Sequence, residues 1–381
     1  MPRSTAALVL AVAACQAPTW ARTPEPEVAA VMPGPARGGA RLDAPAHNDR
    51  CEGCHAEIAA EWRGSLHRRA YVDPEFARAL AREPQPFCRG CHAPEADPKV
   101  RPPPALAALG VGCVTCHAPE GLPAGAVLAA APRCAAPSGH ARKDMCSGPA
   151  RGGAPGAPHA VVASAAFAGP QACASCHEFD FPGRPGAPMQ LTAREHAASR
   201  FAATSCADCH MPWVGGGAAR HRSHAFAASR DPAVLRSALQ VEATRRPGAV
   251  SLRLVPAAVG HAVPTGDLFR RLWVEAEAVD ADGDPVGYDA RALARRFERR
   301  RVSKLHSEQT EVADERPGAP DRREPDGAAV VELDLGPDAD LHAVRWRVLY
   351  QRIEAHVGGE VMLGGEVELA AGALPPLPEE S

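Results

Sequence analysis

Five short cysteine–histidine motifs carry most of the chemistry available to this 381-residue chain. Each reads Cys-x-x-Cys-His, a spacing at which two thiols reach the two vinyl groups of one haem and the adjacent histidine ligates the iron. Zinc knuckles and redox dithiols are the alternatives, but zinc sites do not need a histidine after every second cysteine. A redox dithiol occurs once, within a βαβ pattern that is missing here. The repeats therefore predict five covalently attached haem c groups. In chain order they are motif 1 (Cys51, Cys54, His55), motif 2 (Cys88, Cys91, His92), motif 3 (Cys113, Cys116, His117), motif 4 (Cys173, Cys176, His177) and motif 5 (Cys206, Cys209, His210).

Each six-coordinate iron also needs a distal ligand on the other face of its haem. Five of the sixteen histidines are proximal, which leaves eleven. Methionine is the usual competitor, but few methionines are present, and Met211 directly follows a proximal histidine and cannot reach back over the same ring. Bis-histidine ligation therefore fits better, and it gives lower potentials than His/Met ligation.

Two stretches resemble a known family. Motif 1 is followed by Glu61-Trp62-x-x-Ser65-x-His67, and motif 5 by Met211-Pro212 and then Ser223-His224-x-Phe226. Both patterns are similar to multihaem cytochromes related to the tetrahaem cytochromes of nitrifying bacteria. The resemblance implies that His67 and His224 are distal ligands, with His221 as a weaker neighbour of His224.

Histidines just upstream of attachment motifs are commonly passed to an adjacent haem in the same superfamily. The resemblance therefore implies three further candidate ligands: His159, His196 and His47. His140, between two cysteines without a following histidine, is a weaker candidate. For each of them the alternative is a surface histidine on a loop.

Cys134 and Cys146 lack a following histidine and cannot hold haem in the standard way. An oxidising compartment favours a disulfide between them, although spacing alone does not prove it.

The N-terminus carries export signals. Arg3, the apolar run from Ala6 to Ala14 and the following small residues form a short signal peptide over residues 1–22, too short for a permanent membrane span. Val12-Ala13-Ala14-Cys15 also resembles a bacterial lipoprotein box, in which Cys15 is lipidated; an ordinary signal peptide is the alternative. Residues 23–46 are a Pro/Gly/Ala-rich tether. We expect a periplasmic or outer-membrane protein, with Cys15 as its membrane tether.

The composition limits the kinds of partner the chain can bind and the size of its side-chain core. The net charge of −3 suggests neither nucleic acid nor an anionic membrane surface, so the expected partners are redox proteins. Aromatic residues make up only 4% of the chain, too few for a large side-chain core. Haem macrocycles would supply the missing apolar volume.

The predicted fold is a multihaem cytochrome domain of short helices and loops (residues 47–236), followed by an antiparallel β-sandwich (237–375) and a tail (376–381). We expect helices over Glu57–His67, Pro74–Arg82 and Thr192–Phe201, and a Gly/Pro/Ala-rich loop between Ala118 and Ala160. In the second half, apolar residues recur at every second position, which predicts strands. No amphipathic helices are expected between these strands, as in an antiparallel β-sandwich. These strands are centred on residues 239–243, 250–254, 272–276, 344–350 and 367–369.

One segment of the β-domain is a candidate for contact with a haem: Gly260-His261-Ala262-Val263-Pro264-Thr265-Gly266. It resembles the GHxxPTG turn of cytochromes in which a β-domain follows a haem domain. Glycine and proline fix a tight loop that could present His261 to a haem. The alternative is a histidine that hydrogen-bonds within its own turn.

Six arginines lie between Arg291 and Arg301. A solvated helix face is the favoured interpretation, and a docking patch for an anionic partner or haem propionates is the alternative. We expect the acidic, proline-rich segment Glu311–Asp326 to be a long loop.

Two functions fit five closely packed haems: an extracytoplasmic electron carrier, or an oxidoreductase with one open iron for a small nitrogen or sulfur substrate. The superfamily includes both, among them nitrite reductases and hydroxylamine oxidoreductases. The lysine that replaces the proximal histidine in nitrite reductases is absent from all five motifs, and Tyr71 is the only tyrosine in the haem domain. The sequence therefore favours the carrier.

Overall fold

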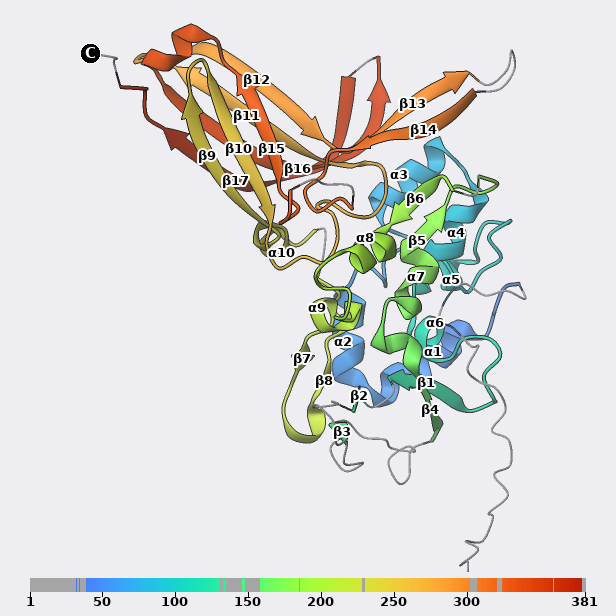
Figure 1. Ribbon diagram of the computed structural model, residues 1–381. Helices are drawn as coiled ribbons and strands as arrows, with labels where there is room; N and C mark the ends of the chain where they lie inside the picture. Colours follow the sequence, from blue (N-terminus) through green and yellow to red (C-terminus); the bar gives the residue numbers. More distant parts are fainter. Residues whose placement is uncertain are drawn as a thin grey trace, which may run out of the picture.

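The chain changes from short helices to long strands at about residue 238 (Figure 1). The computed structural model describes residues 32, 34, 39–130, 133–134, 146–147, 158–184, 186–227, 230–301, 307–320, 324–358 and 360–378. The predicted signal peptide with Cys15, and the weaker candidate ligand His140, lie outside the described residues. No helix within the described ranges is both long and apolar enough to cross a membrane.

The five motifs lie in or at the end of short helices. Because an α-helix has 3.6 residues per turn, cysteines three positions apart fall on one helix face, where both can reach one haem. α1 holds the cysteines of motif 1, and α4, α6, α7 and α9 hold motifs 2 to 5. The helices are α1 (Ala44–Cys54), α2 (Ala56–Gly64), α3 (Pro74–Arg82), α4 (Pro86–His92), α5 (Pro104–Leu109), α6 (Cys113–His117), α7 (Gln171–His177), α8 (Thr192–Ala198), α9 (Cys206–His210) and α10 (Pro232–Ser237), with 3₁₀ turns η3 (Ala165–Ala168), η4 (Gly217–Ala219) and η5 (Pro337–Leu341).

Helix ends follow local capping chemistry. α3 begins with proline after Asp73, whose carboxylate accepts from the backbone N–H groups of Glu75 and Phe76. α9 begins with a capping box between Ser205 and Asp208. The predicted helix over Pro74–Arg82 is found as α3, and the other two predicted helices are shorter than expected. α1 begins at Ala44, so the last residues of the predicted tether are helical.

Small two-stranded sheets complete the helical region. β1 (Ala126–Ala130) pairs in parallel with β4 (Ala160–Ser164). The segment predicted as a loop between Ala118 and Ala160 therefore contains a strand, because its Ala-Val-Leu-Ala-Ala run can pair with a second apolar run. The remaining pairs are antiparallel: β2 (Arg133–Cys134) with β3 (Cys146–Ser147), β5 (Glu178–Asp180) with β6 (Pro188–Leu191), and β7 (Trp213–Val214) with β8 (His221–Arg222).

The β2–β3 register places the backbone of Cys134 opposite that of Cys146. Directly opposed residues of an antiparallel pair have Cα atoms about 4.5–5.5 Å apart, within the range a disulfide needs. The disulfide itself stays a prediction.

Two antiparallel sheets form the C-terminal region. One has the order β15-β10-β9 and the other β12-β11-β16-β17. All five predicted strand centres lie in strands of these sheets. The bounds are β9 (Leu239–Arg246), β10 (Ala249–Pro256), β11 (Arg270–Val279), β12 (Pro285–Leu293), β15 (Ala329–Asp334), β16 (Ala343–Val357) and β17 (Glu360–Leu374).

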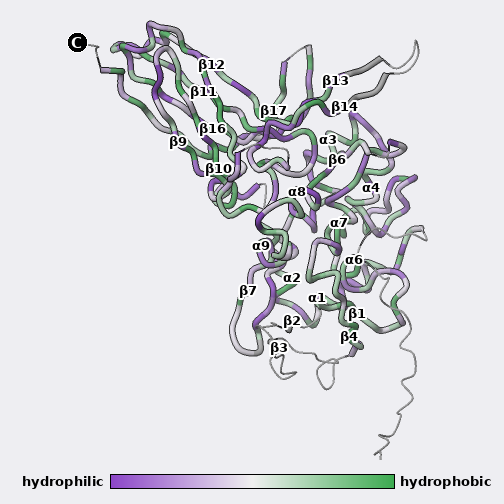
Figure 2. The backbone as a smooth tube through the Cα atoms, in the orientation of Figure 1, coloured by the Kyte–Doolittle hydropathy of each residue, from purple (hydrophilic) through white to green (hydrophobic). Residues whose placement is uncertain are grey.

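Side chains from both sheets enter one buried apolar cluster. Leu252 of β10, Leu333 of β15, Val274 of β11 and Val348 of β16 all belong to it and are fully buried. Apolar residues alternate with polar ones along these strands, and Figure 2 shows both kinds on each strand. In the helical region, by contrast, the main buried apolar cluster of the described residues is small and holds several alanines: Ala44, Trp62, Ala93, Ala96, Leu106, Leu109, Val114 and Ala118.

The arginine-rich segment is not a helix, so the favoured interpretation of Arg291–Arg301 was wrong. It comprises the end of β12 and the strand β13 (Arg295–Arg301), which pairs with β14 (Ser307–Asp314). Glu311–Asp314, predicted as part of a loop, is thus in a strand. Opposite charges explain the pairing: Arg295 contacts Glu311 at 2.7 Å, and Arg296 contacts Glu315 at 2.7 Å.

The shared core of the two sheets makes a stability prediction. Leu333→Ala removes a side chain with no exposed surface and should lower the free energy of unfolding of the β-region by about 2–5 kcal/mol. Val330→Ala, on the same strand but 46% exposed, is the matched control and should change it by less than about 0.5 kcal/mol. Denaturant unfolding measures both. Equal effects of the two changes would contradict the assignment of the inner face.

Candidate haem-binding site

All five motifs line one continuous cavity of about 2880 Å³. An ordinary small-molecule pocket measures roughly 300–1,000 Å³. The wall also contains the turn Gly260–Gly266 of the β-region and parts of β16, so the cavity extends to the boundary between the two regions. A space of this size, lined by ten motif cysteines, fits several large apolar groups and not one small ligand.

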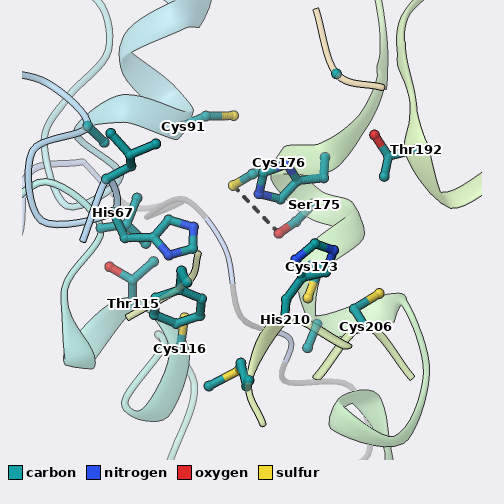
Figure 3. Close-up of a pocket in the computed structure, with 18 of the residues that line it drawn as sticks. His67, Cys91, Thr115, Cys116, Cys173, Ser175, Cys176, Thr192, Cys206 and His210 are labelled. Carbon is teal, nitrogen blue, oxygen red and sulfur yellow. Dashed lines mark hydrogen bonds between the residues drawn. The ribbon is translucent and has the colours of Figure 1, made fainter. Parts of the chain in front are cut away.

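Neighbouring motifs meet through their cysteines. The thiols of Cys91 and Cys176 perturb each other's pKa, so motifs 2 and 4 lie side by side. The thiols of Cys173 and Cys206 do the same and bring motifs 4 and 5 together. Figure 3 shows Cys91 and Cys176 reaching into the cavity from different helices, and Cys173 beside Cys206.

Four proximal histidines face a second histidine from a distant segment. His55 faces His159 with ring centroids 6.3 Å apart, and His67 faces His177 at 6.3 Å. His117 faces His224 at 6.1 Å, and His210 faces His261 at 6.2 Å. Imidazole nitrogens bind transition-metal ions at about 2.0–2.1 Å, so two axial imidazoles on one metal have their centroids about 6 Å apart. The four pairs have the spacing that bis-histidine ligation requires.

Hydrogen bonds orient several of these rings. The Nδ1 atom of His117 lies 2.8 Å from the carbonyl oxygen of Leu128, that of His224 lies 2.8 Å from Arg222 O, and that of His261 lies 3.0 Å from Ala262 O. Since a carbonyl oxygen only accepts, each Nδ1 carries the proton and each Nε2 keeps a lone pair. That tautomer is the one in which Nε2 can bind a metal.

Burial keeps the rings neutral. The pKa of His67 is lowered to about 3 by burial and by the neighbouring His177, His224 and His92. The pKa of His177 is lowered to about 4 by burial, by Arg270 and by the adjacent histidines. The pKa values of His117 and His261 are also lowered, mainly by burial. A metal needs the neutral imidazole, so these environments suit iron ligands.

Motif 2 has different surroundings. The ring of Phe76 stacks on His92 at 3.7 Å between centroids, with an interplanar angle of 7°. His92 Nδ1 donates to Ala70 O at 2.7 Å. Within the described residues, no second histidine ring faces His92. Burial lowers the pKa of His92, the charge of Asp267 raises it, and that of Arg270 lowers it. Because the Nε2 lone pair lies in the imidazole plane, Phe76 flanks this ring and leaves the Nε2 direction free.

The predicted distal histidines thus fall into two groups. His67, His159, His224 and His261 each face a proximal histidine. His196 is buried against the GHxxPTG turn, where a Cβ on Gly260 would lie 3.1 Å from its Cδ2 atom. His47 lines the cavity beside motif 1, and His221 bonds to Ala219 O and Glu61. As ligands, all of them stay predictions.

Several residues that hold the site together were missed in the sequence. Arg230 pairs with Asp73 and Glu75, and Arg352 of β16 pairs with Glu75 from the other side. Glu195 and Arg316 form a buried pair behind the turn of His261. Two charged residues far apart in the chain leave no local sequence pattern that predicts their pairing. The one available hint was that Glu195 directly precedes the candidate ligand His196.

The cavity, the cysteine contacts and the opposed imidazoles define a multihaem c-type cytochrome site. The residues present fit covalent haem c: each motif offers two thiols and an imidazole in the wall of one apolar space.

Comparisons with known proteins agree with this class. Residues 50–118 match the family described as cytochrome c554 and c-prime. The fold is similar to the crystal structure of a penta-heme cytochrome c552 from Thermochromatium tepidum, with a TM-score of 0.60 and 19% sequence identity, over 86% of this chain and 98% of that chain. No curated protein sequence matches the chain. Over residues 50–118 in sequence, and over most of its length in fold, the chain is similar to multihaem c-type cytochromes.

The capping carboxylate of α3 generates a pH prediction. Burial raises the pKa of Asp73, but the Arg230 guanidinium and two backbone N–H groups outweigh burial, and the net pKa is lowered. A lowered folded-state pKa stabilises the fold above the ordinary value of 3.8, and this contribution is lost as the pH falls through the folded-state pKa.

Asp73→Asn keeps a good N-cap but removes the charge, so it should cost about 1–3 kcal/mol at pH 7. The difference from wild type should shrink below about pH 4, as thermal unfolding across pH will measure. Asp326→Asn, at an exposed pair with Arg253, is the control. A difference that persists unchanged at pH 2 would show that the charge is not the cause.

Proposed function

We propose that this chain is an extracytoplasmic electron-transfer protein that relays electrons through five covalently bound haem c groups, at least four of them held between two histidines. The observation that carries the proposal is the set of four opposed imidazole pairs at 6.1–6.3 Å along one cavity. Haem supplies the one-electron chemistry, and its potential is set by axial ligands and burial. The chain supplies spacing, ligation and exclusion of water.

Contacts between motifs support an electron path with a branch. Burial and the imidazoles of His55 and His159 lower the pKa of His117, so motif 3 lies beside motif 1. Burial and the nearby Cys176 raise the pKa of Cys116, so motif 3 also lies beside motif 4. Motif 4 then meets motif 2 through Cys91 and motif 5 through Cys206. The inferred order is 1–3–4, with motifs 2 and 5 as two separate ends beside motif 4.

A second candidate function rests on motif 2. Its histidine has no opposed imidazole in the described part of the chain, and the partly exposed guanidinium of Arg270 lies nearby, paired with Asp267 at 3.1 Å. The N–H groups of Arg270 would act as hydrogen-bond donors to a small ligand at an open axial position. An oxidoreductase acting there on a small nitrogen or sulfur substrate is the alternative to a pure carrier.

Location and domain arrangement are part of the same proposal. We propose that the protein lies in the periplasm or on the outer membrane, anchored through a lipidated Cys15, as the predicted signal peptide and lipoprotein box suggest; uptake of labelled palmitate by wild type and not by Cys15→Ala is the direct test. Redox proteins are the partners. The β-region is proposed as a β-sandwich, since both sheets contribute to one buried cluster.

The haem count is the first test. The intact mass of the mature protein should exceed that of its polypeptide by five haem groups. A Cys173→Ala, Cys176→Ala double variant should lose one haem and much of its stability, because each haem serves as core. A wild type with four haems or fewer would contradict the assignment of at least one motif.

The axial role of His261 is the second test. His261→Ala removes the imidazole that faces His210, so the high-spin ferric EPR signal should rise by about one fifth of the total iron over wild type. His356→Ala, at an exposed ring near the end of β16, is the control and should leave the signal unchanged. An unchanged spectrum in His261→Ala would remove this ligand from the proposal.

Carbon monoxide separates the two candidate functions. Reduced wild type should bind none if every iron is closed, and one equivalent if the haem of motif 2 is open. Stoichiometric binding in wild type would favour the oxidoreductase.

A further inference from the structure

A buried charge cluster lies behind the turn that carries His261. Arg316 Nη2 contacts Glu195 Oε1 at 2.6 Å and Asp314 Oδ2 at 2.6 Å. Glu195 is 1% exposed and Arg316 3% exposed. Isolated buried charges are costly, and removing one partner of such a pair leaves the other uncompensated. The electron path described above uses none of these three side chains.

The charge cluster forms hydrogen bonds to the turn Gly260–Gly266 from two sides. From α8, Glu195 Oε2 accepts from the Thr265 hydroxyl at 2.6 Å and from the Ala262 N–H at 3.3 Å. From the segment after β14, Arg316 Nη1 donates to Pro264 O at 2.7 Å. Thr265 gives its only hydroxyl proton to Glu195, so Thr192 of α8 donates to Thr265 Oγ1 at 2.9 Å. The turn is therefore held to the helical region by side chains that are themselves fixed.

One residue links the cluster to the imidazole. The Ala262 N–H donates to Glu195 Oε2, and the Ala262 carbonyl oxygen accepts from His261 Nδ1 at 3.0 Å. The ring of His261 then lies 6.2 Å from that of His210, with an interplanar angle of 10°. A shift of Ala262 would move or turn the imidazole, because the hydrogen bond to its carbonyl fixes the tautomer and the ring orientation.

The cluster also has an electrostatic effect. Two carboxylates against one guanidinium give it a net charge of −1 when all three are ionised. Glu195 acts on His261 through space as well as through the hydrogen bond to Ala262. Negative charge near an axial ligand favours the ferric state, and low local dielectric strengthens the effect.

We propose that Glu195 and Arg316 are a positioning pair that seats His261 as the axial ligand of motif 5 and lowers the potential of that one haem. The inference rests on the proposed ligation by His261 and adds to it the residues that set the ligand. The pair acts through the turn and touches neither haem nor substrate, so its signature is a change confined to one haem of five.

The experiment uses the full-length protein with its haems attached and compares Glu195→Gln, Arg316→Gln, Thr265→Val and Thr265→Ser. Potentiometric titration and ferric EPR are the readouts. In Glu195→Gln one of the five redox components should move to a more positive potential. In Arg316→Gln the high-spin signal should rise above wild type by up to about one fifth of the iron. Thr265→Val should change the same component as Glu195→Gln, and Thr265→Ser, which keeps the hydroxyl, should restore it.

Glu354→Gln is the matched control. It breaks ion pairs with Arg78 and Arg82 that also join the two regions and involve no residue of the His261 turn. A merely structural pair would lower thermal stability in the Glu195, Arg316 and Glu354 variants without moving a single potential, and that outcome overturns the proposal. If Arg316→Gln does not fold, the Thr265→Val and Thr265→Ser pair decides the matter alone.

His261→Ala separates the two levels of inference. If that variant shows new high-spin iron while the Glu195 and Thr265 variants keep five wild-type potentials, the positioning pair is wrong and the ligation stands. If His261→Ala itself leaves the EPR spectrum unchanged, the proposed ligation fails and the positioning inference fails with it.

Discussion

The requirement that two imidazoles face each other about 6 Å apart organises the helical region. In each of four places one ring follows a cysteine pair on a short helix, while the other comes from a segment up to 110 residues away, as between His67 and His177. If each pair holds one iron as proposed, it would tolerate little error, because metal–nitrogen bonds of about 2 Å would require both rings to lie along one axis. The backbone carbonyls that accept from Nδ1 turn the rings into that axis, and burial keeps them neutral.

The two halves of the chain differ in the groups that fill their interiors. The sheets bury leucine and valine from both layers against one another, as ordinary β-structure does. The helical region has few large apolar side chains to bury, and its helices surround a large cavity lined by the motifs. Haem attachment and folding are therefore coupled there, in the same way that metal binding is folding free energy in small metal-dependent domains.

The sheets are more than an appendage of the helical region. Arg352 of β16 pairs with Glu75 of α3, Arg295 of β13 donates to Pro188 O and Met189 O, and the GHxxPTG turn is clamped by Glu195 and Arg316. Figure 1 shows β13, β14 and the far ends of β16 and β17 lying over α3 and β6. Because several separate contacts span the boundary, His261 is presented by a fixed body and not by a loose loop.

The sequence by itself determined what is local. The cysteine–histidine motifs depend on spacing within five residues, the helix at Pro74 on an aspartate cap, and the strands on alternation with period two. It also pointed to His67, His159, His224 and His261, although not to the motif that each one faces. The partners were decided by the tertiary structure, since opposed rings come from segments with no local relation. Arg291–Arg301 shows the same limit: arginine is a good helix former, yet pairing with the acidic strand that follows made the segment a β-ribbon, and propensity is a weak prior against such long-range pairing. The buried pair of Glu195 and Arg316 lies 121 residues apart in the chain, and only the folded chain brings these charges together behind His261.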